Sequence, residues 1–490
     1  MRFTSDIFKS IFLTGSIVSC IASIFSRDEK EFLNLASGGS DFSSIYLVLF
    51  FIIAGAVAGR YIARKFKQPE VLGELVIGVI IGAFLYQINL PEMVLLRHQG
   101  EVKNVETGVF SNGDTWTTSI EKNLSADPAI EEKLTTILTD PSFPVYDFTV
   151  KSILLFSNLG VLVLLFLVGL ESSIEEMLKV GGPSMTTAMI GVIVPSILGF
   201  AVSSFMLPDK SISLHLFMGS ALSATSIGIT ARVFKDMNKL HIPESRIVLG
   251  AAVIDDVLGL ILLAVVTGIV TLGAFELSSV LFIILKAVLF LGATLYIGSR
   301  FLRQQIKVVA ILENRNTRLL FPFALLVLLA WISEAIGLSG IVGAFAAGLI
   351  IKEEYFRDAL KDKVKSVKEV IEPVEAIFAP VFFVLMGIQV DVTAFAKPEI
   401  LGLAVVLTIV AIVGKLFSGV FAKGMDKKII GIGMIPRGEV GLIFAGIGKA
   451  IGILDSSLFS SVIILVILTT LITPPALKWA FENYDRKHQH

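Results

Sequence analysis

The stretch that decides the fold is residues 250–260, GAAVIDDVLGL, in which two adjacent carboxylates, Asp255 and Asp256, lie inside an unbroken apolar run. The apolar sequence extends from about residue 247 to residue 270, long enough to cross a bilayer core of roughly 30 Å as a helix. Counted from Arg246 at about 1.5 Å per residue, the aspartates lie some 14 Å deep, close to the membrane midplane. Ionisable side chains are costly at that depth, so the pair indicates a functional site with a partner elsewhere in the chain.

The composition of the whole chain is that of a membrane protein. Its 490 residues are 54% hydrophobic and 17% charged, and the mean hydropathy is +0.82. These values exclude an ordinary soluble domain. The single cysteine, Cys20, excludes an internal disulfide framework, and five scattered histidines offer no metal-ligand spacing. No nucleophile or phosphate loop accompanies the aspartates, so we expect no enzyme activity, no cofactor and no nucleic-acid partner.

Hydropathy and length predict about thirteen membrane spans and an all-α polytopic fold. The spans cover residues 43–63, 70–87, 149–170, 183–206, 214–234, 245–271, 278–299, 317–336, 338–352, 370–390, 399–421, 428–450 and 457–478. Lys and Arg gather in almost every second short loop, which places the C-terminus in the cytoplasm and the N-terminus outside. The long polar loop, residues 89–148, then lies outside, either as a small folded cap or as a disordered insertion.

The N-terminal residues 1–26 are typical of a signal peptide, because Arg2 and Lys9 precede a short apolar stretch and polar sequence follows. Cleavage would deliver the N-terminus to the outside, and an extra retained helix is the alternative. Residues 479–490 form a short tail after the last span. We expect an integral protein of the plasma (inner) membrane.

The two halves of the chain echo each other. Residues 73–78 and 82–84 parallel residues 340–345, and LFLVGL at 165–170 parallels FVLMGI at 383–388. Two inverted six-helix repeats, joined by a linker helix at residues 278–299, are the pattern of secondary transporters. The fifth and twelfth spans carry helix-interrupting residues at matching positions, namely short hydroxyl side chains in one and Pro436 in the other. We therefore predict two crossed discontinuous helices.

Lys415, in the eleventh span, lies about 12 Å deep when counted from Lys423 at 1.5 Å per residue, at about the depth of the aspartates. Adjacent residues are about 100° apart on a helix, so one aspartate can pair with Lys415 while the other faces a cavity. Arg437 and Glu439 form a second candidate pair, with a structural role at the broken helix. A midplane carboxylate among hydroxyls and helix-end carbonyls suits a small hard cation, and it can hold a proton instead.

These residues carry a resemblance to the monovalent cation:proton antiporter-2 family over nearly all of residues 43–478. The motifs are QPEVLGE at 68–74, SATS at 223–226, VIDD at 253–256, GK at 414–415 and PRGEV at 436–440. The resemblance implies a homodimer in which a mobile core moves the site like an elevator. The core would comprise residues 183–271 and 399–478, and the dimerisation domain residues 43–171 and 317–390.

By the same resemblance, Asp256 would be the main carrier of Na⁺ and of the proton, and Asp255 would pair with Lys415. Ser223, Thr225 and Ser226, at the crossing, complete the expected ion- and proton-binding set. The expected function is exchange of a monovalent cation, Na⁺ and also Li⁺, for protons across a lipid membrane. A K⁺/H⁺ antiporter on the same scaffold is one alternative, and a cation channel is the alternative from a different class.

Overall fold

In the part of the chain that the computed structural model describes, the regular secondary structure is helical. It describes residues 42–488 apart from 67, 113–114, 124–127, 172–180, 227–228, 231–232, 235–236, 238, 240–241, 273–276, 313–316, 361–365, 393–396 and 423. The predicted signal peptide, residues 1–26, therefore lies outside the described residues.

Ten helical segments of the described chain are long and apolar enough to cross a membrane. They are α3 (Ser43–Lys65), α4 (Glu70–Gln87), α9 (Phe143–Glu171), α11 (Gly181–Met206), α14 (Pro243–Leu272), the run from α15 (Leu277–Ala293) through a π-helical turn (Thr294–Gly298) into α16 (Ser299–Leu312), α17 (Thr317–Ala335), α20 (Val367–Ile388), α21 (Pro398–Leu416) and α24 (Ser456–His488). Four shorter helices also fall within predicted spans: α12 (Ile212–Ala221), α18 (Gly340–Ile350), α22 (Lys427–Gly433) and α23 (Glu439–Ala450). Each predicted span coincides with one or more of these helices, which confirms the all-α membrane fold, while the count of thirteen crossings remains a prediction.

Local sequence sets the ends of several helices. Gly337 has a φ of +82° between α17 and α18, in the left-handed region that favours glycine, and it separates the two helices where the sequence suggested a split. Ser366 and Glu369 form a capping box at the start of α20, so two otherwise unpaired N–H groups are satisfied there. The Asp426 side chain accepts from the N–H groups of Lys428 and Ile429 at the start of α22.

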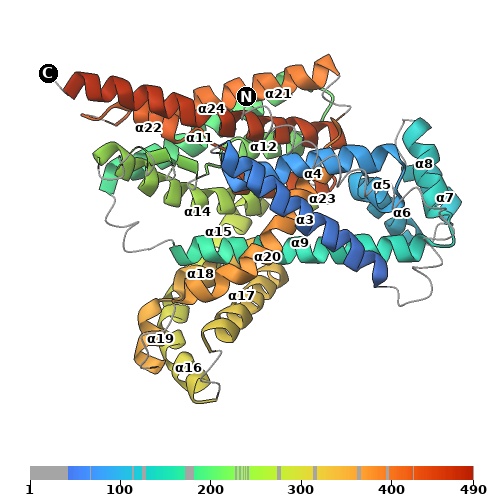
Figure 1. Ribbon diagram of the computed structural model, residues 1–490, viewed down its shortest axis with the longest axis horizontal. Coiled ribbons are helices and arrows are strands. Elements are labelled where there is room, and N and C mark those ends of the chain that lie inside the picture. The colour runs from blue at the N-terminus through green and yellow to red at the C-terminus, as the bar shows by residue number, and fades with distance from the viewer. Residues whose placement is uncertain are drawn as a thin grey trace, which may run out of the picture.

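The helices pack as two groups; in Figure 1 most of the first group lies above most of the second, and α3 and α4 lie beside α23 at mid-height. We call α11, α12, α14 and α21–α24 the upper group, and α3, α4, α9, α17, α18 and α20 the lower group. Within the upper group α11 packs against α12, α14 and α21, and within the lower group α9 packs against α18 and α20. These groups occupy the residue ranges of the expected core and dimerisation domains, whose roles remain predictions.

Glycines bring the two halves of the lower group into backbone contact. A Cβ built on Gly387 of α20 would lie 2.2 Å from the Leu75 carbonyl oxygen of α4, and one built on Gly169 of α9 would lie 2.2 Å from the Phe345 carbonyl oxygen of α18. In both contacts the third helix of one predicted repeat (α9 or α20) packs against the second helix of the other (α18 or α4). Only glycine permits such approach, so these contacts fix how the two repeats interlock.

The long loop folds as a cap of four helices on one end of the molecule, at the right of Figure 1. These helices are α5 (Pro91–Arg97), α6 (Gln99–Asn112), α7 (Trp116–Asn123) and α8 (Pro128–Leu138). Val94, Val105 and Leu134 are fully buried in a cluster that continues into α4, α9 and α20. Of the two alternatives for residues 89–148, the described part is therefore a packed cap.

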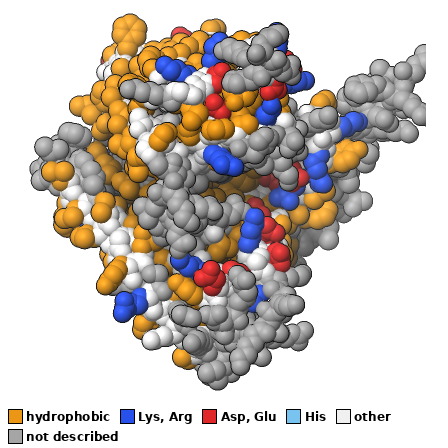
Figure 2. All heavy atoms as spheres, turned by 90° about the vertical axis from the view of Figure 1, so that its left-hand side faces the viewer, with side chains coloured by type: hydrophobic (Ala, Val, Ile, Leu, Met, Phe, Trp, Pro, Cys, Tyr) orange, Lys and Arg blue, Asp and Glu red, His pale blue; other side chains and the backbone are white. Residues whose placement is uncertain are grey.

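Charged side chains gather at the opposite end. Figure 2 views the molecule from the left of Figure 1 and shows Lys and Arg beside Asp and Glu on a face bordered by apolar side chains. Near this end Lys239 and Asp485 form an ion pair of 2.5 Å.

Candidate functional site: crossed broken helices and a buried ion pair

Two interrupted helices cross in the upper group. Helix α12 ends at Ala221 and the described residues 222–226 after it are not helical, whereas α22 ends at Gly433 and α23 begins at Glu439. The Ser226 N–H donates to the Pro436 carbonyl at 2.8 Å, so the two breaks touch through their backbones. Pro436 has no N–H and disfavours helical geometry in the residue before it, which explains the second break.

The side chain of Arg437 holds the first break in place. This fully buried guanidinium donates to the carbonyl oxygens of Leu222 and Ala224 and, at 3.4 Å, to that of Ser223. Leu222 is the C-cap of α12, and the two other residues follow it, at the negative end of the helix dipole, where a cation is favourable. The sequence suggested Glu439 as the partner of Arg437, and the Glu439 side chain lies outside the described part of the chain.

Two threonines that the sequence did not single out position Arg437. The Arg437 N–H donates to Thr469 Oγ1 at 3.3 Å, and Thr470 Oγ1 donates to the Arg437 carbonyl at 2.6 Å. Both are buried in α24. An adjacent pair of hydroxyl side chains inside an apolar span was the signal available in the sequence, because buried hydroxyls require hydrogen-bond partners.

The acidic pair lies on α14 and is buried, with Asp255 1% and Asp256 5% exposed. Lys415, at the end of α21 and 0% exposed, places its Nζ 3.2 Å from Asp255 Oδ1 and 3.3 Å from Oδ2. The negative charges of Asp255 and Asp256 stabilise the Lys415 ammonium group, and the positive charge of Arg437 opposes it. The structure thus brings together two acids and two bases, and the lysine contacts the first of the two aspartates.

The three candidate hydroxyl ligands lie at the first break. Ser223 Oγ donates to the carbonyl of Ser220, three residues earlier in the chain, at 2.7 Å. Thr225 Oγ1 donates across the crossing to the Met434 carbonyl at 3.5 Å. Thr230, which the sequence did not single out, donates to the Gly433 carbonyl at 2.7 Å. Ser226 lines a cavity.

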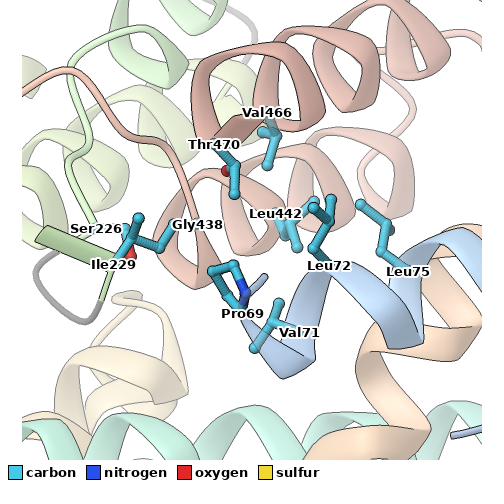
Figure 3. Close-up of a pocket in the computed structure, with 10 residues that line it drawn as sticks. All are labelled: Pro69, Val71, Leu72, Leu75, Ser226, Ile229, Gly438, Leu442, Val466 and Thr470. Carbon is cyan, nitrogen blue, oxygen red and sulfur yellow. The ribbon is translucent and has the colours of Figure 1, made fainter. Parts of the chain in front are cut away.

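The cavity has a volume of about 100 Å³ and lies where the crossing faces α4 (Figure 3). Ser226, Gly438 and Thr470 line it from the upper group, and residues from the first half of α4 line it from the lower group. In Figure 3, Pro69 and Val71 lie across the cavity from Val466 and Thr470 of α24. The crossing therefore borders a space on the boundary between the two helix groups.

Two further charged residues within apolar stretches find partners that the sequence did not reveal. Glu74, 1% exposed, pairs with Arg60 of the adjacent helix α3. Lys286 of α15 donates to the Ile336 carbonyl at 3.0 Å, at the turn between α17 and α18. Both contacts tie neighbouring helices together.

Comparison with known proteins gives consistent relatives over most of the chain. Residues 47–482 match the model of the sodium/hydrogen exchanger transmembrane family. The chain is 35% identical over 454 residues to the high-affinity Na⁺/H⁺ antiporter NhaS3 of Synechocystis sp., covering 91% of both chains. It is also 35% identical over 337 residues to the Na⁺/H⁺-K⁺ antiporter GerN of Bacillus cereus, covering 67% of this chain and 84% of that one.

The fold is also similar to a solved structure. The sodium proton antiporter MjNhaP1 of Methanocaldococcus jannaschii superposes with a TM-score of 0.58 at 15% sequence identity, covering 90% of this chain and 98% of that chain. At this identity the similarity concerns the arrangement of the helices.

Proposed function

The chain belongs to the sodium/hydrogen exchanger family, and on that premise we propose that it is a secondary antiporter that exchanges Na⁺, and also Li⁺, for protons. Asp256 is the shared site: its carboxylate binds either the cation or a proton, and the two compete. The observation that carries this proposal is the contact of Lys415 with Asp255, because it commits the lysine to one aspartate of the pair.

The ion pair explains why two aspartates are needed. A lysine buried without a counter-charge is costly, and Asp255 offsets that cost. Asp256 is 5% exposed on the next position of α14, and about 100° of helical rotation separates the two side chains. Asp255 and Lys415 therefore form a fixed pair, whereas Asp256 is the group that changes its occupant.

The crossing supplies ligands of the right chemistry. Small hard cations prefer oxygen ligands, and in secondary transporters broken helices offer backbone carbonyls near the midplane. Ser226 lies at the cavity beside the crossing, and Arg437 holds the end of α12 so that its carbonyls keep their positions. We assign Ser226 and Thr225 to the approach of the ion, and Arg437 to positioning the break.

Alternating access requires the crossing to face each side of the membrane in turn. In our proposal the upper group is the mobile core and the lower group is the fixed dimerisation domain, so the core shifts along the boundary where the cavity lies. Tyr46, Phe50 and Val57 of α3 are exposed apolar side chains on the lower group. They suit contact with lipid and with a second copy of the chain. We place the protein in the plasma membrane with its C-terminus in the cytoplasm.

Potassium is the second candidate cation. The relative GerN is named as an antiporter of Na⁺, protons and K⁺, and it is as similar in identity to this chain as NhaS3 is. The residues of the site are the same for both proposals, so the cation must be identified by measurement. A cation channel of the same fold would conduct without a fixed exchange ratio.

Reconstitution into proteoliposomes tests the proposal. A pH-sensitive dye inside the vesicles reports proton movement when Na⁺, Li⁺ or K⁺ is added outside over a range of pH. We expect saturable exchange with Na⁺ that Asp256→Asn abolishes without loss of the folded protein.

The matched control is Asp455→Asn. Asp455 is 49% exposed and pairs with Lys210, and asparagine can still cap the following helix. This variant should exchange at the rate of the unmodified protein. Exchange at that same rate in Asp256→Asn would refute the assignment of the site.

A further inference from the structure

At the cap end of the molecule, two cationic side chains hold the C-terminal end of α20. Arg97 of the cap donates through Nε to the Ile388 carbonyl at 3.3 Å, and Lys449 at the end of α23 donates to the Gln389 carbonyl at 3.1 Å. These are carbonyls that a helix leaves unpaired, at the negative end of its dipole. The end of α20 is therefore satisfied by side chains from two other parts of the chain.

Lys449 is held there by a backbone carbonyl and an aromatic ring. Its side chain is 3% exposed and its Nζ lies 4.6 Å from the centre of the Phe459 ring. The carboxylates of Glu101, Asp391 and Asp455 attract its charge, and each of these residues is at least partly exposed. A lysine bound to a carbonyl and a ring can leave without stranding a buried carboxylate, so this contact is suited to reversible opening.

Two more hydrogen bonds cross the same boundary. The Asp391 N–H donates to Ser460 Oγ at 2.9 Å, and Ser456 Oγ donates to the Arg97 carbonyl at 3.1 Å. Ser456 and Ser460 belong to α24 of the upper group, whereas Asp391 follows α20 of the lower group and Arg97 belongs to the cap. With Lys449, all three bonds join the upper group to the rest of the molecule.

The opposite end of this boundary is hollow. The cavity is lined by Pro69, Val71 and Leu72 at the start of α4, and Tyr86 near the end of α4 carries the Arg97 guanidinium 4.1 Å above its ring. The fourteen helical steps from Leu72 to Tyr86 span about 21 Å at about 1.5 Å each. The boundary is thus tied at the cap end and open toward the site at the other.

We propose that Lys449 is the gate residue of the outer side: its bond to the Gln389 carbonyl closes the boundary while the site faces the cytoplasm, and it must be released before the site can face outward. This inference rests on the proposed alternating access. The bond from Ser456 of α24 to the Arg97 carbonyl of the cap closes the same boundary, so the core is held against the cap while the gate is closed.

Labelling of a cysteine in the boundary tests the gate. Met386 of α20 faces α23, because a Cβ built on Gly446 would lie 3.1 Å from its Sδ. In a Cys20→Ser background, Met386→Cys provides a single reporter for a membrane-impermeant maleimide applied to the outside of intact cells. Lys449→Met should raise its labelling about tenfold or more, which corresponds to the loss of one charge-assisted hydrogen bond.

Lys210→Met is the matched control. Lys210 lies at the same end and pairs at 3.2 Å with Asp455, which is 49% exposed, but both residues flank helices of the upper group. Its substitution should leave the labelling unchanged. Equal labelling in the Lys449→Met and Lys210→Met backgrounds would overturn the proposal.

Ser456→Ala keeps the test decisive if Lys449→Met does not fold. It removes one hydroxyl from the boundary and should raise labelling by a smaller factor; labelling at the unmodified level in this variant counts against the gate. Because labelling reports accessibility and not ion movement, a chain that exchanges no cation but responds to Lys449→Met would refute the proposed function and retain the gate.

Discussion

Lys415→Met perturbs the contact on which the site assignment depends. Lys415 and Asp255 are 0% and 1% exposed, at 3.2 Å, and removing one partner of a buried pair costs about 3–5 kcal/mol because the other charge is left unpaired. Unfolding entropy is about 2.1 cal/mol/K per residue, or roughly 1 kcal/mol/K for the 490 residues of this chain. We therefore expect the thermal midpoint to fall by about 3–5 °C.

The assay is thermal unfolding in detergent, followed by tryptophan fluorescence. The double variant Lys415→Met/Asp255→Asn removes both charges and should recover most of the lost midpoint, since no unpaired charge remains. Lys210→Met, which breaks an exposed pair worth at most about 1 kcal/mol, should change the midpoint by less than about 1 °C. If the double variant instead loses the sum of the two single losses, the ion pair contributes nothing and the reasoning fails.

Three further predictions concern other parts of the molecule. Gly387→Ala places a Cβ 2.2 Å from the Leu75 carbonyl oxygen and should lower the free energy of unfolding by about 1–3 kcal/mol. Gly292→Ala, whose Cβ meets open space, should not lower the thermal midpoint. Equal midpoints for the two variants would contradict the packing. Arg437→Lys keeps the charge but loses the planar fork that reaches several carbonyls, so exchange in proteoliposomes should fall about tenfold or more, and full exchange would show that the fork is unnecessary. Burial raises the pKa of Glu92 in the cap above its ordinary value of 4.5, so the folded state binds the proton more tightly than the unfolded state. The stability of the protein therefore declines as pH rises from about 4.5 through the raised pKa. Glu92→Gln should remove that decline in thermal midpoints measured from about pH 4 to pH 8, and parallel curves for the two proteins would show that Glu92 does not cause it.

The membrane fold and the position of the site could be predicted because both follow from one-dimensional constraints. A span must be apolar for a fixed length, and depth can be counted along a helix from its charged end. This counting brought Asp255 and Lys415 to the same depth, and the structure shows them in contact. The breaks were predictable at Pro436 and at the hydroxyl-rich segment for an equally local reason.

Contacts that depend on which helices are neighbours could not be predicted. Glu74 gave no sign that it would meet Arg60, because pairing across α3 and α4 follows from the glycine contact between Gly59 and Gly73. Arg437 was expected to pair with Glu439, whose side chain lies outside the described part of the chain, so that pair stays a prediction. The backbone carbonyls that Arg437 binds have no signature in the sequence. Nothing in the sequence distinguishes Lys449, since a single lysine at the end of a span is ordinary.

The glycine contacts between the two halves of the lower group also constrain how the protein is made. Gly78 of α4 meets Gly387 of α20, and Gly169 of α9 meets Gly348 of α18, so each half leaves the ribosome with a helix face that only the other half can cover. Gly387 follows Gly78 by about 300 residues, which at 5–20 residues per second is a delay of roughly 15–60 s. During biosynthesis the first helices must therefore wait in the bilayer, incompletely packed, until the second half is inserted.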